Sequence, residues 1–142
     1  MVRLAHLITG SNLAAQDLVH DAFIKVSRRW DEIAVPAAYL RVTVVNECRS
    51  WLRHRVVVDR HDRSLIAAVE PEPELPDELG RVWQAMHTLP ERQRVALVLR
   101  YWLDLPVSET AEAMGCPTGT VKSLVHRALH ALEEELSDDA EA

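Results

Sequence analysis

Hydrophobic positions recur at helical spacing along most of this 142-residue chain, and no long stretch alternates apolar with polar side chains. Ser11 and Asn12 can cap a helix that continues to Trp30, and Pro36 suits the first turn of a second helix that ends at about Arg55. The β-branched residues 42–45 have low helix propensity, so a strand is a legitimate alternative there, although the flanking segments favour a helix. The pattern predicts an all-α fold.

Four further helices are predicted in the second half of the chain, over residues 77–88, 91–103, 107–114 and 118–135. Pro90 and Pro106 stand at helix starts, and Gly115 stands where a helix must end. Residues 136–142 form an acidic tail, of which the last six residues, SDDAEA (137–142), are expected to be disordered.

The helical pattern breaks between the two halves. From Val56 to about Asp77 there is no sustained period, and the segment includes EPEPELPDE with its three prolines. Such a segment cannot bury enough apolar surface to offset the entropy of ordering it. We therefore predict a flexible acidic linker, with its boundaries near residues 65–76, between two small helical lobes at residues 1–64 and 77–135.

Residues 107–132 have the spacing of a helix-turn-helix. Ala111 is small where two helices must cross, Gly115 provides the turn four positions later, and Val121 packs back six positions after that. The apolar side chains of the second helix share one stripe: Val121, Leu124, Val125, Ala128, Leu129 and Leu132. The other side carries donors suited to phosphate oxygens and base edges: Thr118, Thr120, Lys122, Ser123, His126 and Arg127.

An amphipathic hairpin with a solvated polar face would show the same spacing. Residues 113–132 contain no carboxylate, however, and solvated faces usually mix both signs of charge. The helix-turn-helix is therefore predicted to contact DNA.

The net charge of −6 does not exclude nucleic acid, because the acidity is local. Residues 70–78 and 133–141 hold 11 of the 22 acidic residues and none of the 16 basic ones, which leaves a balance of +5 elsewhere. Residues 41–63 contain six arginines, a charge pattern that suits a nucleic-acid backbone. Tyr39 and Trp51 could stack on bases, and a role in the core is at least as good an interpretation for each.

Three segments resemble one family of known proteins. LPERQRVALVLRYWLDLPVSETAEAMGCPTGTVKSLVHRAL, residues 89–129, is similar to region 4 of a bacterial extracytoplasmic-function sigma factor. AAQDLVHDAFIKVSRRW, residues 14–30, and PAAYLRVTVVNECRSWLRHR, residues 36–55, resemble region 2 of the same family. The resemblance implies a transcription initiation factor that binds core RNA polymerase and promoter DNA, with an anti-sigma factor as a further partner that the sequence leaves open.

The resemblance also implies roles for individual residues. The helix that docks on polymerase would hold Asp17, Leu18, Asp21 and Phe23. Region 2 would contact the minus-ten element through Asn46, which matches the asparagine that helps hold a flipped-out base, and through three arginines: Arg41, Arg49 and Arg53. Region 4 would read the minus-thirty-five element through Lys122, Ser123, His126 and Arg127.

The chain departs from the family pattern at three places. His20 stands where glutamine is usual, and Leu124 stands where many relatives have a basic residue, which predicts one phosphate contact fewer. The opening MVRLAHLITG matches the end of the first region 2 helix, with no helix before it in this sequence. Region 2 is therefore expected to be incompletely packed, and promoter melting is the activity most affected.

Other chemistry finds little support. His126, His130 and Glu134 could face one metal, but structural zinc sites usually have four ligands that include cysteine, so no metal or other cofactor is predicted. No nucleophile and base are placed together, so we do not expect an enzyme. No signal peptide precedes the fold, and no apolar run approaches the roughly 18 residues of a membrane helix. With Cys48 and Cys116 interpreted as reduced thiols, these features indicate a cytoplasmic protein.

Two alternatives from other functional classes remain open. One is a degenerate sigma-like protein that binds polymerase or an anti-sigma factor without opening promoters. The other is a dimeric helix-turn-helix regulator that binds duplex DNA without polymerase.

Overall fold

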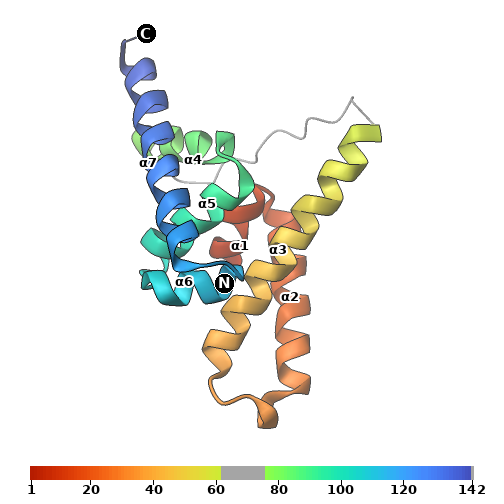
Figure 1. The fold of residues 1–142 in the computed structure, drawn as a ribbon. Coiled ribbons are helices and arrows are strands. Elements are labelled where there is room, and N and C mark those ends of the chain that lie inside the picture. Colours follow the sequence, from red (N-terminus) through yellow and green to blue (C-terminus); the bar gives the residue numbers. More distant parts are fainter. Residues whose placement is uncertain (62–75, 142) are drawn as a thin grey trace. The chain divides into compact units, whose positions relative to one another are not determined.

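The computed structural model describes residues 1–61 and 76–141, and every regular element in these ranges is helical (Figure 1). The prediction of an all-α fold is therefore confirmed. The chain divides into two compact units, Met1–Ala68 and Val69–Ala142. Most of the predicted linker, residues 65–75, lies outside the described residues.

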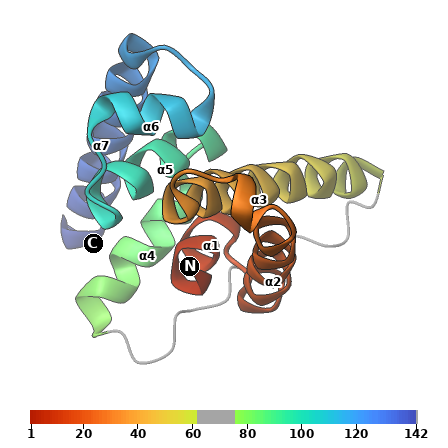
Figure 2. The ribbon, with the colours of Figure 1, turned by 90° about the horizontal axis from the view of Figure 1, so that it is seen from below.

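Unit 1 consists of three helices and a short connection. They are α1 (Val2–Thr9), α2 (Asn12–Arg28), the 3-10 turn η1 (Trp30–Glu32) and α3 (Pro36–His61). Figures 1 and 2 show α2 and α3 side by side, joined by η1 at one end. Ser11 caps α2 as predicted, because its hydroxyl accepts a 3.2 Å hydrogen bond from the Ala14 amide.

The core of unit 1 forms where α1, α2 and α3 meet. On α2 the buried positions follow the helical period: Ala15, Val19, Ala22 and Val26. Val44 and Val45 of α3 are also fully buried, and Leu4 and Ile8 of α1 complete the packing. The alternative of a strand at residues 42–45 is therefore wrong, because burial of these valines outweighs their low helix propensity.

α3 extends to His61, beyond the predicted end at Arg55, so the linker interpretation is wrong for residues 56–61. No glycine or proline stands between Ala37 and His61 to stop the helix. Valine lowers helix propensity by less than about 1 kcal/mol per residue, which is too little to end a helix already formed.

Unit 2 consists of α4 (Asp77–Thr88), α5 (Glu91–Leu97), the π turn η2 (Val98–Trp102), α6 (Val107–Met114) and α7 (Thr118–Glu141). Helices begin after Pro90 and Pro106, and α6 ends at Gly115 with φ 64°, all as predicted. The predicted helix 91–103 is instead α5 followed by a wider turn, in which the Leu103 amide donates to the Val98 carbonyl at 3.2 Å.

α7 packs against α4, α5 and α6, and it continues to Glu141. The prediction of a disordered tail is therefore wrong for residues 137–141. Leucine, alanine and glutamate, which make up half of residues 136–141, are strong helix formers, and no glycine or proline follows Gly119.

A buried arginine joins α4 to α5 in unit 2. Arg94 donates a 3.1 Å hydrogen bond to the Leu89 carbonyl, and loss of water on burial lowers the pKa of its guanidinium. Trp83, Val95 and Leu99 are buried in the same unit. Among the described residues, no helix is both long enough and apolar enough to span a membrane.

Candidate nucleic-acid and protein interfaces

The turn between α6 and α7 has the predicted helix-turn-helix geometry. Gly115 adopts a left-handed conformation, and the Cys116 amide donates to the Ala111 carbonyl at 3.1 Å, which closes the end of α6. Ala111 and Val121 are buried where the two helices pack. The exposed side of α7 is thereby held in a fixed orientation relative to α6.

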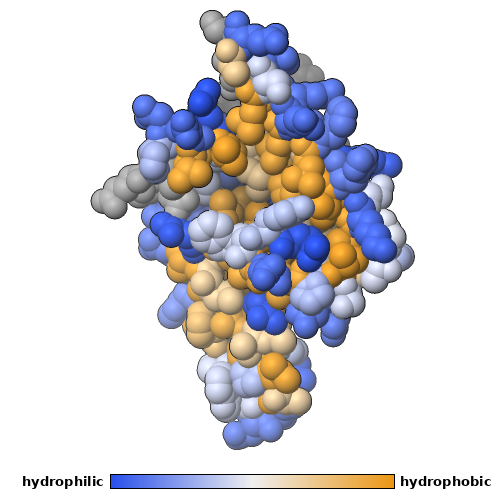
Figure 3. All heavy atoms as spheres, turned by 90° about the vertical axis from the view of Figure 1, so that its left-hand side faces the viewer, coloured by the Kyte–Doolittle hydropathy of each residue, from blue (hydrophilic) through white to orange (hydrophobic). Residues whose placement is uncertain are grey.

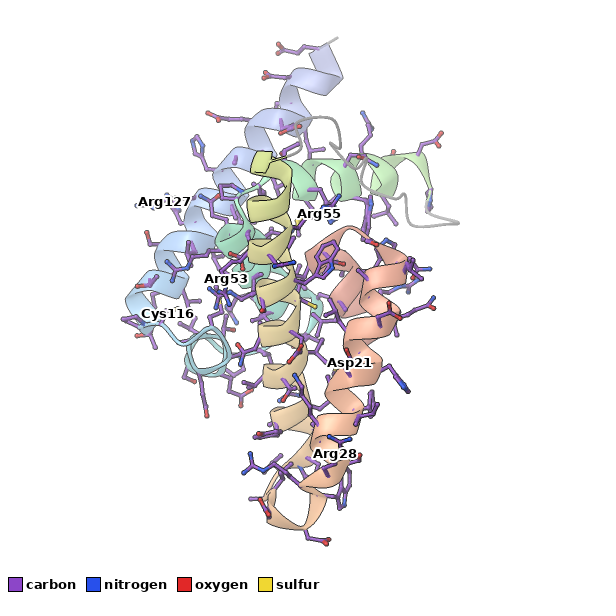
Figure 4. All side chains as sticks on the ribbon, turned by 90° about the vertical axis from the view of Figure 1, so that its right-hand side faces the viewer. Asp21, Arg28, Arg53, Arg55, Cys116 and Arg127 are labelled. Carbon is purple, nitrogen blue, oxygen red and sulfur yellow. The ribbon has the colours of Figure 1, made fainter. Side chains whose placement is uncertain are left out.

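The predicted DNA-binding residues of α7 form two adjacent rows. Thr118, Lys122 and His126 are exposed and lie four residues apart, so they follow one side of the helix. Ser123, half-buried, and Arg127, exposed, lie four residues apart in the neighbouring row, and Figure 4 shows Arg127 projecting from α7. Thr120, also half-buried, lies off both rows, near the start of the helix.

This face can bind an anion. It carries Lys122 and Arg127 and no carboxylate, and it begins at the N-terminus of a long helix, where unpaired amides favour negative charge. Such a surface has the donors and the charge that phosphate and base edges require.

Two apolar residues of the predicted stripe on α7 have different environments. Leu124 is only 8% exposed and lies in the packed stripe with Val121 and Ala128, as predicted. Leu129, predicted in the same stripe, is exposed.

On α3 the structure brings together three of the four residues predicted to contact DNA. Asn46, Arg49 and Arg53 lie three and four residues apart on one side of the helix, with Asn46 and Arg53 exposed and Arg49 half-buried. Arg41 lies about 140° around the helix from Asn46, so it does not belong to this row. Figure 4 shows Arg53 and Arg55 on the second half of α3.

The two aromatic residues of α3 each lie beside an arginine. The guanidinium of Arg55 lies 5.1 Å from the ring centre of Trp51, and that of Arg29 lies 5.8 Å from the ring centre of Tyr39. Trp51 is half-buried and Tyr39 is exposed, so neither is enclosed in the core. Each pair presents a positive charge next to an aromatic ring.

The residues predicted to dock on polymerase lie on more than one side of α2. Asp17 and Asp21 are exposed and four residues apart, while Leu18 is half-buried beside them. Phe23 is 51% exposed and lies about 160° around the helix from Asp21. The four residues therefore do not form a single patch.

Sequence reasoning missed a second exposed row on α2. Leu13 and Phe23 stand at its two ends, with Gln16 and His20 between them at helical spacing. Leu13 is apolar, yet the structure leaves it largely exposed. The helical period was the available signal, but it did not show which apolar side would face solvent.

Sequence reasoning also missed several exposed apolar side chains in unit 2. The exposed large side chains are Leu79, Val82, Tyr101, Trp102 and Leu129. Apolar surface of this kind is visible on the face drawn in Figure 3. The π turn at residues 98–102 carries the two aromatic members, and such turns often occur at functional sites. Exposed apolar side chains of this size suit a protein partner.

Cys48 is buried in unit 1, and His130 lies beside Glu134 on α7. Burial raises the pKa of the Cys48 thiol to about 12, and the Glu47 carboxylate contributes to the rise, so this thiol is protonated at neutral pH. Nδ1 of His130 lies 3.6 Å from the Glu134 carboxylate. Within residues 1–61 and 76–141, no three His, Cys, Asp or Glu side chains are grouped as a metal would require.

Family models match both halves of the chain. Sigma-70 region 2 matches residues 1–56, and sigma-70 region 4 matches residues 79–132. The matched residues include α1, α2 and most of α3 in unit 1, and nearly all of α4 to α6 with the first part of α7 in unit 2.

Individual relatives are similar over most of their length. An RNA polymerase sigma-E factor from Streptomyces avermitilis is 35% identical over 140 residues, which cover 96% of this chain and 78% of the relative. The sigma-E factor from Streptomyces antibioticus is 39% identical, covering 86% and 70%. Among solved structures, the sigma factor RpoE of Bartonella quintana, in complex with the anti-sigma factor NepR, is 26% identical with a TM-score of 0.81, covering 96% of this chain and 89% of that one.

Proposed function

The chain belongs to the sigma-70 family as an extracytoplasmic-function sigma factor, and we propose that its two units divide promoter recognition between them. The protein is a transcription initiation factor that binds core RNA polymerase and directs the enzyme to promoters. The observation that carries this conclusion is that both sigma regions lie on one chain, in order, at residues 1–56 and 79–132.

Unit 2 reads the minus-thirty-five element with α7 in the major groove. Lys122 and Arg127 supply charge for phosphates and donors for guanine, while the nearby polar side chains add hydrogen bonds. The acid-free face and the helix N-terminus support this assignment. The residues that carry it are Thr118, Thr120, Lys122, Ser123, His126 and Arg127.

Unit 1 holds the minus-ten element along α3. Asn46 has an amide that can bond the edge of an extruded base, and Arg49 and Arg53 on the same side can neutralise the flanking phosphates. Arg41 faces another direction and contributes from outside this row.

The polymerase contact of unit 1 lies on α2. Asp17 and Asp21 offer charge, Leu18 lies half-buried beside them, and Phe23 offers apolar surface for a protein partner. A partner that contacts all four residues must reach two sides of α2, and a pair of polymerase helices can do so. The exposed apolar side chains of unit 2 suit a second contact with the same large partner.

The protein acts in the cytoplasm, where RNA polymerase lies, and catalyses no reaction itself. We also propose an anti-sigma factor as its regulatory partner, since the similar Bartonella quintana structure contains one.

Run-off transcription tests this function. Purified chain and core polymerase, incubated with fragmented genomic DNA, should give defined transcripts that are absent without the chain. Binding to polymerase without transcripts would favour the degenerate interaction protein. Specific duplex binding in the absence of polymerase would favour the dimeric regulator.

A further inference from the structure

We propose that Arg29 is a positioning residue that holds the connection between α2 and α3 in one conformation for the promoter strand. The inference rests on the proposed role of unit 1 at the minus-ten element. Arg29 acts through Tyr39 and Glu32, with no contact of its own to DNA.

The side chain of Arg29 bonds to both sides of the connection. Its Nε donates a 3.1 Å hydrogen bond to the Glu32 carboxylate in η1, and its Nη1 donates a 3.0 Å hydrogen bond to the Tyr39 hydroxyl in the first turn of α3. The guanidinium also lies 5.8 Å from the centre of the Tyr39 ring. One residue at the end of α2 therefore ties the short helix to the start of α3.

Only arginine suits this position. Its planar guanidinium presents several donors in fixed directions, so one group can bond a carboxylate and a hydroxyl while it lies beside a ring. A lysine ammonium keeps the charge but has no planar fork with which to hold both partners. The hydrogen bond to Glu32, with a further electrostatic contribution from Tyr39, raises the pKa of the guanidinium, so it stays charged.

The connection between α2 and α3 has exposed side chains that could bind a strand more tightly if the backbone is already held in place. Trp30 and Val35 are 58% and 60% exposed, and Tyr39 is exposed beside them. A mobile connection would lose conformational entropy when a strand bound there, whereas one already held in place loses less. Figure 4 shows the neighbouring Arg28 at the end of α2, next to this connection.

Because the contacts of Arg29 are exposed, their loss should change the order of the connection without lowering the stability of the fold. The Arg29 and Glu32 side chains are 57% and 69% exposed, and ion pairs so open to water contribute little to the free energy of unfolding. Variants at Arg29 should therefore fold normally, and a loss of DNA binding in them would not reflect loss of the fold.

Two measurements test the proposal. The first is amide hydrogen exchange in the free protein, read at Glu32 and Ile33, whose amides bond to the Arg29 and Trp30 carbonyls at 3.0 and 3.3 Å. Exchange at these amides should accelerate about threefold to tenfold in Arg29→Ala and Arg29→Lys, and it should not change in Arg28→Ala. Unchanged exchange in both Arg29 variants overturns the proposal, whatever the DNA results.

The second measurement uses holoenzyme and a fluorescent single-stranded oligonucleotide. Its sequence is the non-template strand of the minus-ten element of a promoter identified by run-off transcription. Arg29→Ala and Arg29→Lys should weaken binding by about threefold to tenfold, with polymerase affinity and the salt dependence unchanged. Tyr39→Phe removes only the hydroxyl that accepts the bond, and the double variant with Arg29→Ala should bind no worse than Arg29→Ala alone.

A different result would identify Arg29 as a direct phosphate ligand. In that case the effects of Arg29→Ala and Tyr39→Phe would multiply, and the salt slope would fall by about 0.7, as expected for one single-strand phosphate contact. If the wild-type holoenzyme gives transcripts but does not bind this oligonucleotide, the proposed role of unit 1 at the minus-ten element fails, and the exchange measurement still decides whether Arg29 orders the connection.

Discussion

Thr88, the last residue of α4, donates a 2.8 Å hydrogen bond from its hydroxyl to the carboxylate of Glu135 on α7, 47 positions later in the chain. The same hydroxyl lies 2.7 Å from the Ala85 carbonyl, so it can bond to either oxygen. This contact holds Glu135, the last residue of the predicted helix, just before the segment that the sequence predicts to be disordered.

Removal of this contact should loosen the last turns of α7. In Glu135→Ala and Thr88→Val, amide exchange at residues 136–141 should accelerate about twofold to tenfold, because one hydrogen bond is worth about 0.5–1.5 kcal/mol. Glu133→Ala, which changes an exposed carboxylate of the same helix, is the matched control. Equal acceleration in the control would show that charge, and not the contact with Thr88, holds this segment.

Lys122→Ala and Arg127→Ala should weaken promoter binding while polymerase affinity stays unchanged. Each change removes a cation from the face of α7, so the salt slope should fall by about 0.9 for a phosphate contact, or discrimination at one base pair should fall by about 1–3 kcal/mol. Footprinting of holoenzyme at several salt concentrations distinguishes the two cases. Arg81→Ala, an exposed arginine on α4, should change neither quantity, and loss of polymerase binding in the α7 variants would contradict their assignment to DNA.

Asn46→Ala should destabilise the open complex by about 1–3 kcal/mol and so lower its yield, because the amide that bonds the base edge is lost. Asn46→Asp should be worse, since its carboxylate adds repulsion from the phosphates near Arg49 and Arg53. Permanganate reactivity of unpaired thymines measures the opening. An Asp variant as active as the wild type would exclude a base contact at this position.

Changes on α2 should affect polymerase and leave DNA recognition intact. Asp21→Arg should slow association with core polymerase about tenfold at low salt, because the charge that steers the encounter is reversed. Phe23→Ala should mainly speed dissociation, since it removes apolar contact area. Surface plasmon resonance measures both rates, and Ser27→Ala near the end of the same helix is the control. Unchanged rates in both variants would show that α2 does not form the polymerase interface.

Because of Cys48, the free energy of unfolding should fall as the pH rises in the alkaline range. Because burial raises its pKa from 9.0 to about 12, the thiol stays protonated in the folded chain while it ionises in the unfolded chain above pH 9. Its contribution to stability is complete below pH 9 and is lost as pH rises toward 12, by about 1.4 kcal/mol at pH 10. Urea unfolding of wild type and Cys48→Ala at pH 8 and pH 10 isolates this group, and equal losses in the two proteins would contradict it.

The helix starts followed from local chemistry. Ser11 caps α2, prolines precede α5 and α6, and Gly115 ends α6, as the sequence predicts, because each signal acts within one or two turns of the backbone. The helix ends at His61 and Glu141 could not be predicted in this way. No glycine or proline stands after Pro36 in α3 or after Gly119 in α7, so no local stop signal marks either end.

The candidate sites show the same difference between features set by local sequence and features set by packing. The order of residues was enough to identify the family and the helix-turn-helix. Lys122 with His126, and Arg49 with Arg53, share a side of a helix because residues four apart must do so. Which side faces solvent depends on the neighbouring helices. Leu13 and Leu124 are both apolar at helical spacing, yet packing leaves the first exposed and buries the second. The bonds of Arg29 to Glu32 and Tyr39 likewise required the turn to fold, because contact between residues ten apart depends on the path of the backbone between them.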